Sequence, residues 1–233
     1  MGPGLLLNWF DLADESAADF NAWHSREHVI ERLSIPGFVQ GRRFVSLDAI
    51  PSPGHRYLVA YDTVDLSTLE SPAYAARLDF PTPLTQKFVP SVRAMTRTAY
   101  EIVWSAGRGS GGFLRTIHLP SLGDLLGADG RELHENVSSV YGCDAVVKVG
   151  LGRPNGSITH FKDATREGRA TDSRSREDYP WALVIEANSR AALDASAEAF
   201  EQGVRRHWPQ RAHTFDGHGY QLVFTMYAEH PQN

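Results

Sequence analysis

The hydrophobic and polar positions of the first hundred residues alternate between strand-like and helix-like patterns. Residues 5–12 form an apolar, strand-like run, and a helix is expected over 17–33, where Pro36 and Gly37 stop it. The segments that follow are a strand over 39–47, a strand over 56–62, a helical stretch around 65–78 and a strand over 98–104. This order, β-α-β-β-α-β, is that of a ferredoxin-like unit.

The same order of elements recurs in the second half of the chain. Residues 106–112 are rich in glycine and serine, which predicts a flexible linker. Beyond it the pattern predicts strands over 113–119, 145–149, 181–187 and 219–227, with helices over 131–141 and 190–207. A polar stretch over 153–180 is either a lid or a disordered loop. We therefore expect one unit over 1–105 and a second over 113–233.

The predicted strands carry apolar residues on both sides. In the strand over 56–62, Tyr57, Val59 and Tyr61 share one side, and Leu58 lies on the other. A ferredoxin-like sheet holds its two helices on one face, so its other face needs a cover. The sequence therefore predicts an α+β protein in which two tandem units cover one another and enclose a space lined by aromatic side chains.

Composition limits the classes of function. The chain has 233 residues, of which 42% are hydrophobic and 22% charged, and its net charge is −5. Without clustered Lys and Arg, binding to nucleic acid or to an anionic membrane has no electrostatic support. One cysteine, Cys143, excludes an intramolecular disulfide, and no signal-like or membrane-spanning run is evident. We expect a cytoplasmic protein, monomeric or homodimeric, whose partner is a small apolar molecule.

The helix over 17–33 carries the candidate chemistry. His24, Glu27, His28 and Glu31 stand at i, i+3, i+4 and i+7, so two imidazoles and two carboxylates share one helical face. A carboxylate beside a histidine fixes its tautomer and raises its basicity, as a general base requires. A solvated polar face is the alternative, because other positions of this helix form a separate apolar arc.

Other residues are candidates for binding rather than catalysis. These are Trp23, which borders the histidine face, and four residues of predicted strands, Asn8, Tyr57, Tyr61 and His118. His24 to His28 also matches the zinc motif H-x-x-E-H, but a third ligand is lacking and no metal is expected. In the second half the counterparts of His24, Glu27 and His28 are Asp129, Glu132 and Leu133, so that copy is degenerate.

A family resemblance adds to these patterns. The run WHSREHVIERLSIPGF, residues 23–38, followed by Gly-Arg-Arg-Phe at 41–44, resembles EthD-like members of the dimeric α+β barrel superfamily. The resemblance covers about the first hundred residues at the level of motifs. It implies a tandem fusion of two ferredoxin-like units as an intramolecular dimeric α+β barrel. It also implies a cavity of the kind used by cofactor-free oxygenases, polyketide cyclases, lactone isomerases, decarboxylases and some haem enzymes.

Residues and resemblance together give one expected function and two alternatives. We expect an enzyme without a cofactor that transfers a proton on a small apolar carbonyl compound of aromatic or polyketide-like character. His28 or His24 would act as the base, and Glu27 would orient it. The alternatives are a monooxygenase, either cofactor-free or linked to haem, and a non-catalytic protein that binds a small molecule.

Overall fold

The predicted order of elements is present in the structure. It is a computed structural model that describes residues 2–13, 17–119, 131–169, 179–209 and 215–229. The fold is mixed α+β, and its hydrogen-bonded strand order β1-β3-β2-β8-β5-β7-β6-β4 closes on itself as a barrel. This closed barrel confirms the predicted fold class. No helix of the described residues combines the length and the apolar character needed to cross a membrane.

The chain divides into two compact units that each combine separate stretches of sequence. The N-terminal unit contains residues 2–101, 155–178 and 223–233, and the C-terminal unit contains 102–154 and 179–222. Strands β4 (Val92–Ala106) and β8 (Asp216–Tyr227) each contribute to both units. The units therefore differ from the predicted halves 1–105 and 113–233, because the second half supplies part of the first unit.

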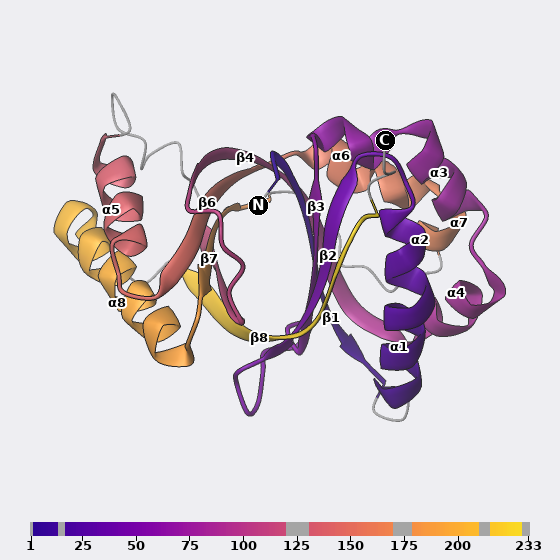
Figure 1. The fold of residues 1–233 in the computed structure, drawn as a ribbon, viewed down its shortest axis with the longest axis horizontal. Coiled ribbons are helices and arrows are strands. Elements are labelled where there is room, and N and C mark those ends of the chain that lie inside the picture. Colours follow the sequence, from indigo (N-terminus) through magenta and orange to yellow (C-terminus); the bar gives the residue numbers. More distant parts are fainter. Residues whose placement is uncertain (1, 14–16, 120–130, 170–178, 210–214, 230–233) are drawn as a thin grey trace. The chain divides into compact units, whose positions relative to one another are not determined.

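The N-terminal unit holds most of the helices, which cover one face of its strands (Figure 1). Its first helix is continuous but consists of three segments, of which the middle one is π-helical. The strands of this unit, besides parts of β4 and β8, are β1 (Gly4–Leu12), β2 (Phe38–Ser46) and β3 (Tyr57–Thr63). The helices are α1 (Ala17–Trp23), the π-helical η2 (His24–His28), α2 (Val29–Leu33), η3 (Leu66–Glu70), α3 (Pro72–Asp79), α4 (Pro83–Phe88), η4 (Val89–Ser91), α6 (Gly156–Phe161), η6 (Lys162–Ala164) and α7 (Arg166–Arg169).

The C-terminal unit is simpler, with two helices that lie side by side (Figure 1). Its strands are β5 (Phe113–Leu119), β6 (Val146–Pro154), β7 (Trp181–Ala187) and parts of β4 and β8, and its helices are α5 (Arg131–Tyr141) and α8 (Arg190–His207). Ser189 caps α8 by accepting a hydrogen bond from the Ala192 amide. Apolar residues on one stripe of α8, including Leu193 and Phe200, are buried.

Strand β1 positions the face on which the site is built. It runs antiparallel to β3 on one side and to β4 on the other, so that Asn8 lies opposite Val59 and opposite Arg97. Alternate residues of a strand point to opposite faces of the sheet. Asn8 and its neighbours Leu6 and Phe10 therefore project toward the same side.

The polar stretch over 153–180 is not a plain loop where the structure describes it. It forms α6, η6 and α7, and Asn155 caps α6 by accepting from the amide of Ile158. The Asn155 amide in turn donates to the Ala99 carbonyl of β4 at 2.9 Å. These helices belong to the N-terminal unit. Residues 170–178 lie outside the described part of the chain.

The glycine-rich segment 106–112 is irregular beyond Ala106, as predicted, but it is packed rather than free. Gly107 has φ = +82°, and a Cβ there would collide with the backbone carbonyl of Val147 in β6. A Cβ at Gly111 would likewise collide with backbone atoms of Ala187 in β7. Glycine is required here because the chain passes close to neighbouring strands, not because the segment is a flexible spacer.

Candidate active site

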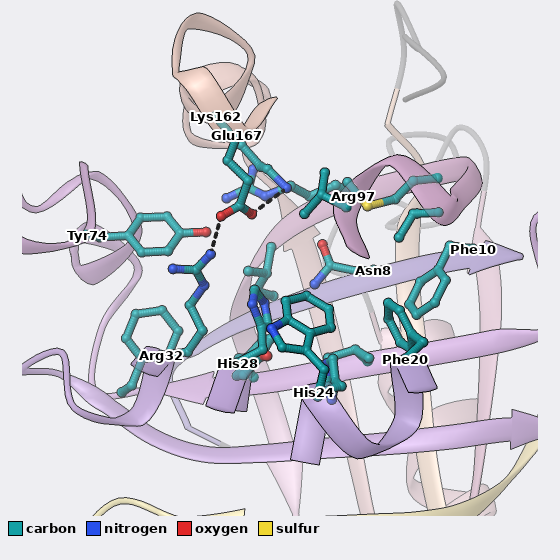
Figure 2. Close-up of a pocket in the computed structure, with 18 residues that line it drawn as sticks. Asn8, Phe10, Phe20, His24, His28, Arg32, Tyr74, Arg97, Lys162 and Glu167 are labelled. Carbon is teal, nitrogen blue, oxygen red and sulfur yellow. Dashed lines mark hydrogen bonds and ion pairs between the residues drawn. The ribbon is translucent and has the colours of Figure 1, made fainter. Parts of the chain in front are cut away.

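A pocket lies within the N-terminal unit, between its first helix and its sheet (Figure 2). The pocket is apolar on one part of its wall and charged on another. Its described lining residues are Leu6, Asn8, Phe10, Phe20, Trp23, His24, His28, Arg32, Phe38, Val59, Tyr61, Tyr74, Val89, Val92, Met95, Arg97, Lys162 and Glu167. The cavity volume in this conformation is about 70 Å³. A cavity of about 150 Å³ admits benzene, so this pocket has to widen to admit an aromatic ligand.

A π-helical turn presents both histidines to the pocket. The amide of Val29 donates to the carbonyl of His24, five residues earlier, instead of to residue 25 as in an α-helix. Such single π-helical turns are frequent at functional sites. The rings of His24 and His28 lie 5.3 Å apart, and His28 also contacts Trp23 at 4.8 Å between ring centroids.

His24 is held in one protonation state and one tautomer. It is 3% exposed, and Arg43 Nη1 lies 3.0 Å from its Nδ1. A guanidinium only donates hydrogen bonds, so Nδ1 accepts and the ring proton is on Nε2. Burial, with the charges of His28 and then Arg43 and Arg32, lowers the pKa of His24 well below its usual value. His24 is therefore a neutral imidazole that offers Nε2–H as a hydrogen-bond donor.

His28 is also neutral near pH 7 but lacks a partner for its Nδ1. Burial, followed by the positive charges of Arg32 and Lys162, lowers its pKa to about 3, although Glu167 acts in the opposite direction. Its Nδ1 is buried, and no described group forms a hydrogen bond with it. The residue as a whole has intermediate exposure. A neutral imidazole that lines the pocket is able to accept a proton from a ligand.

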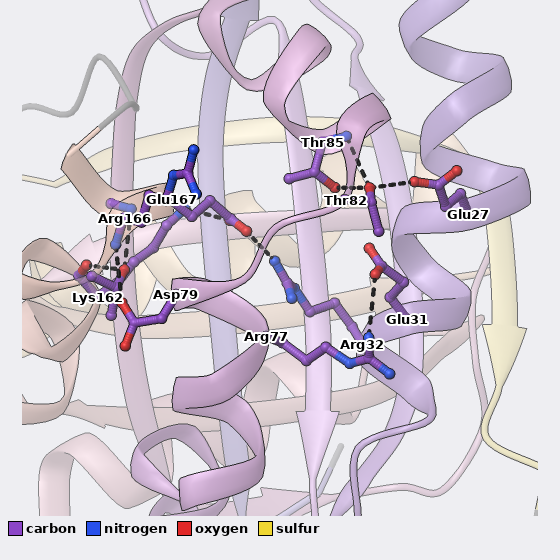
Figure 3. A network of polar contacts seen from close by, with 12 residues as sticks. Glu27, Glu31, Arg32, Arg77, Asp79, Thr82, Thr85, Lys162, Arg166 and Glu167 are labelled. Atoms are coloured by element: carbon purple, nitrogen blue, oxygen red, sulfur yellow. Dashed lines mark hydrogen bonds and ion pairs between the residues drawn. The ribbon is translucent and has the colours of Figure 1, made fainter.

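A buried ionic triad forms the charged part of the wall. Glu167 Oε2 lies 2.5 Å from Arg32 Nη2, and its Oε1 lies 3.1 Å from Lys162 Nζ (Figures 2 and 3). Burial alone would raise the pKa of Glu167, but the two cations hold it well below its usual range. The same carboxylate holds the pKa of Arg32 above its ordinary value, against the effect of burial. All three groups are therefore charged.

The carboxylates of the first helix contact Thr82 and Arg77, outside the pocket (Figure 3). Glu27 accepts a hydrogen bond from the Thr82 hydroxyl at 2.6 Å, and Glu31 lies 3.7 Å from Arg77. Neither carboxylate lines the pocket. The structure therefore places Glu27 where it anchors α4 to the helix, whereas Arg43 forms a hydrogen bond with His24.

The structure brings together five of the eight residues named from the sequence. His24, His28, Trp23, Tyr61 and Asn8 line the pocket. Tyr57 stacks on Phe10 with ring centroids 5.6 Å apart and does not line it. His118 lies in β5 of the C-terminal unit and is not a lining residue.

Sequence reasoning missed Arg32, Arg97, Lys162 and Glu167. Arg97 precedes the strand predicted over 98–104 by one residue, and it belongs to the longer β4, which begins at Val92. Lys162 and Glu167 gave no signal in the sequence, because they lie in the polar stretch over 153–180. Glu167 is 135 residues from Arg32 along the chain.

The equivalent helix of the C-terminal unit carries no matching set. In α5, Glu132 is exposed and Leu133 is buried, while Asp129 lies outside the described residues. Across the part of the chain that the structure describes, no three His, Cys, Asp or Glu side chains are grouped so that they could hold a metal ion.

The closed barrel of eight antiparallel strands in a mixed α+β chain places the protein in a structural class. This is the fold of the dimeric α+β barrel proteins. The chain matches no protein-family model, and no curated protein sequence is significantly similar to it.

Three solved structures illustrate the likeness. An anthrone oxidase-like protein superposes with a TM-score of 0.59 at 11% identity, over 97% of this chain and 93% of that one. A Fusobacterium nucleatum protein named provisionally as a monooxygenase gives 0.58 at 8% identity, over 97% and 95% of the two chains. A mutant chlorite dismutase from Candidatus Nitrospira defluvii gives 0.54 at 11% identity, over 95% and 90%. At these identities the likeness shows the fold alone.

Proposed function

We propose that this protein is a cofactor-independent enzyme that transfers a proton on a small, apolar carbonyl compound of aromatic or polyketide-like character. One observation carries the proposal: two neutral imidazoles with different roles lie in one aromatic-lined pocket. His24 offers an Nε2–H donor that suits a carbonyl oxygen, and His28 offers a ring that suits a base. The resemblance of residues 23–38 to EthD-like proteins supports the same assignment.

The low pKa of His28 is compatible with a role as base. Arg32 and Lys162 disfavour the imidazolium, but the same cations favour an enolate formed beside it. The two cations therefore lower the pKa of the imidazolium and the pKa of the bound carbonyl compound alike. In addition, His28 needs no prior deprotonation near pH 7, because it is already neutral.

The experiment is hydrogen–deuterium exchange at the carbon next to the carbonyl. We would incubate the protein in D₂O with anthrone and 1-tetralone and follow deuterium uptake by mass spectrometry. Wild type should accelerate exchange, and His28→Asn should abolish the acceleration because the base is removed. His24→Asn should slow exchange by roughly 10²–10³-fold, as the loss of one oxyanion donor does in other enzymes.

The control for this experiment is His134→Asn, because His134 is exposed on α5 of the other unit. Unchanged exchange in both His24→Asn and His28→Asn would discard the assignment. Binding of these ketones without any exchange would instead favour a non-catalytic binding protein.

Oxygenation is the second candidate, favoured by the apolar wall formed by Phe10, Phe20 and Trp23. It shares the first step, because an electron-rich anion formed by His28 could then react with dioxygen. The structural likeness to an anthrone oxidase-like protein is in keeping with this candidate. Oxygen consumption with anthrone, measured with an electrode, separates oxygenation from simple proton transfer.

A haem-linked activity has less support from the residues present. The cavity of about 70 Å³ is too small for haem in this conformation. His24 already accepts a hydrogen bond at Nδ1, and its Nε2 carries a proton and so has no free lone pair for iron. We derive no step through haem, and titration with haem, read by its Soret band, tests this view.

A further inference from the structure

Arg97 is a buried cation of the pocket with unused donors. It is 7% exposed, and its Nη1 donates to the backbone carbonyls of Ile158 and Thr159. Its Nε and Nη2 are buried, and neither forms a hydrogen bond within the part of the chain that the structure describes. Backbone carbonyls carry no net charge. The positive charge of Arg97 is therefore solvated only in part by the protein, which is costly for a buried group.

The remaining charges of the pocket do not compensate Arg97. Its described lining contains three cations, Arg32, Arg97 and Lys162, and a single carboxylate, Glu167. That carboxylate is engaged by Arg32 and Lys162. His24 and His28 are neutral and add no charge of either sign. The described lining thus has an excess of positive charge, and a bound anion would offset it.

The surroundings of Arg97 define what kind of anion fits. Asn8 lies directly opposite Arg97 in the β1–β4 pair, and both line the pocket, where an amide and a guanidinium are available to an oxygen atom (Figure 2). Phe10 and Phe20, 5.6 Å apart between ring centroids, form an apolar wall of the same pocket. A ligand that satisfies both parts has an acidic oxygen at one end and an apolar, planar body.

We infer that the pocket binds its ligand as an organic anion, with the acidic oxygen of an apolar aromatic compound on Arg97 and Asn8. This inference deepens the proposed function, on which it rests, by naming the charge state of the substrate class. Carboxylates, enolates and phenolates share the required chemistry. In the proton-transfer reaction the same guanidinium holds the oxygen that is already negative or becomes so.

The test compares acids with neutral amides of the same shape, using the full-length protein. The probes are benzoate against benzamide and 2-naphthoate against 2-naphthamide, with binding read by calorimetry. Wild type should bind each acid about tenfold or more tightly than its amide, because a hydrogen bond to a charged partner is the stronger kind. Arg97→Met should abolish this preference.

The matched control is Arg93→Met, because Arg93 lies on the same strand but is exposed. This variant should keep the wild-type preference for acids. Arg97→Lys, which retains the charge, should keep a preference for acids and serves if the Met variant does not fold. Equal binding of acid and amide by wild type, or binding of neither, overturns the inference, as does an acid preference that survives in Arg97→Met.

The result of this binding test can be distinguished from the result of the deuterium-exchange experiment that tests the proposed function. Deuterium exchange into a neutral ketone depends on His28, whereas the acid preference depends on Arg97. Exchange without an acid preference would contradict the anion site and support the proposed enzyme. An acid preference without exchange would support the anion site and contradict the proposed reaction.

Discussion

At the scale of single residues, the account depends on charge states that burial imposes. The pKa of His28 is about 3 in the fold and near 6.5 in an unfolded chain, so unfolding takes up a proton between these values. The stabilising effect of the neutral ring is therefore present above pH 6.5 and is lost progressively as the pH falls toward 3. His24, whose pKa is also lowered, acts in the same direction.

This gives a prediction for stability against pH. The free energy of unfolding in urea should fall by about 2 kcal/mol between pH 7 and pH 5 on account of His28 alone. His28→Gln should lose less stability over this interval than wild type does, whereas Gln at the exposed His134 should leave the loss unchanged. Identical pH dependence in wild type and His28→Gln would show that His28 is not buried as a neutral ring.

Loss of the Glu167 carboxylate should destabilise the fold. Glu167→Gln leaves Arg32 and Lys162 buried without their carboxylate, and removing one partner of a buried ion pair costs about 3–5 kcal/mol. Glu31→Gln is the control, because its partner Arg77 is 47% exposed and such pairs contribute about 0–1 kcal/mol. Equal losses of the free energy of unfolding in urea for Glu167→Gln and Glu31→Gln would contradict the buried ionic triad.

At the scale of elements, the π-helical turn is the feature that sets the spacing of the histidines. The predicted helix over 17–33 is present from Ala17 to Leu33, because its apolar residues Phe20, Trp23, Val29 and Leu33 are all buried. The pattern did not reveal the widened turn at His24–His28. Helix propensity is a local property, whereas this turn is stabilised by contacts such as that of Arg43 with His24.

Shortening the π-helical turn tests its role. Deletion of Arg26, which is exposed, should convert the turn to α-helix while the buried residues on either side keep their phase. Stability should be retained, and the acceleration of deuterium exchange into 1-tetralone should be lost because the histidines change their spacing. Arg26→Ala removes the same side chain without changing the spacing and should accelerate exchange as wild type does. Unimpaired exchange in the deletion variant would show that the π-helical turn is incidental.

Several elements were predictable within a few residues, but the early start of β4 and the short helices α4, α6 and α7 were not, and the site was predictable only in part. Strands such as β5 and helices such as α8 follow from local alternation and periodicity. Helical spacing predicted that His24 and His28 share a face, but it placed Glu27 and Glu31 on the same face, and neither carboxylate lines the pocket. The insert that supplies Lys162 and Glu167 is polar and has no strong periodicity, so its packing on the N-terminal unit depends on contacts that are distant in sequence.

At the scale of the whole molecule, the two compact units do not coincide with the two halves of the sequence. We propose that the halves are tandem copies of one unit, the second of which lost the histidines and gained the insert. The first half then depends on the second, because β8 and the helices α6 and α7 complete its unit. On this proposal, neither 1–105 nor 113–233 is expected to fold independently.

A fragment experiment examines this dependence. The fragment 1–105 lacks Glu167, which pairs with the buried Arg32. It also lacks the part of β8, from Val223 onward, that belongs to the N-terminal unit. It should therefore bind the dye ANS and unfold without cooperativity in urea. Adding the fragment 113–233 should restore a cooperative transition. A cooperative transition in fragment 1–105 alone would show that the first half is an independent domain.

The central claim is that His24 and His28 are both neutral in the folded protein and differ in role. Nitrogen-15 NMR of the imidazoles, followed as the pH is lowered from 7.5 to 5, tests it most directly. The account predicts that neither ring gains a proton over this range and that His24 is the Nε2–H tautomer throughout. Titration of either ring near pH 6.5, or a proton on Nδ1 of His24, would contradict it.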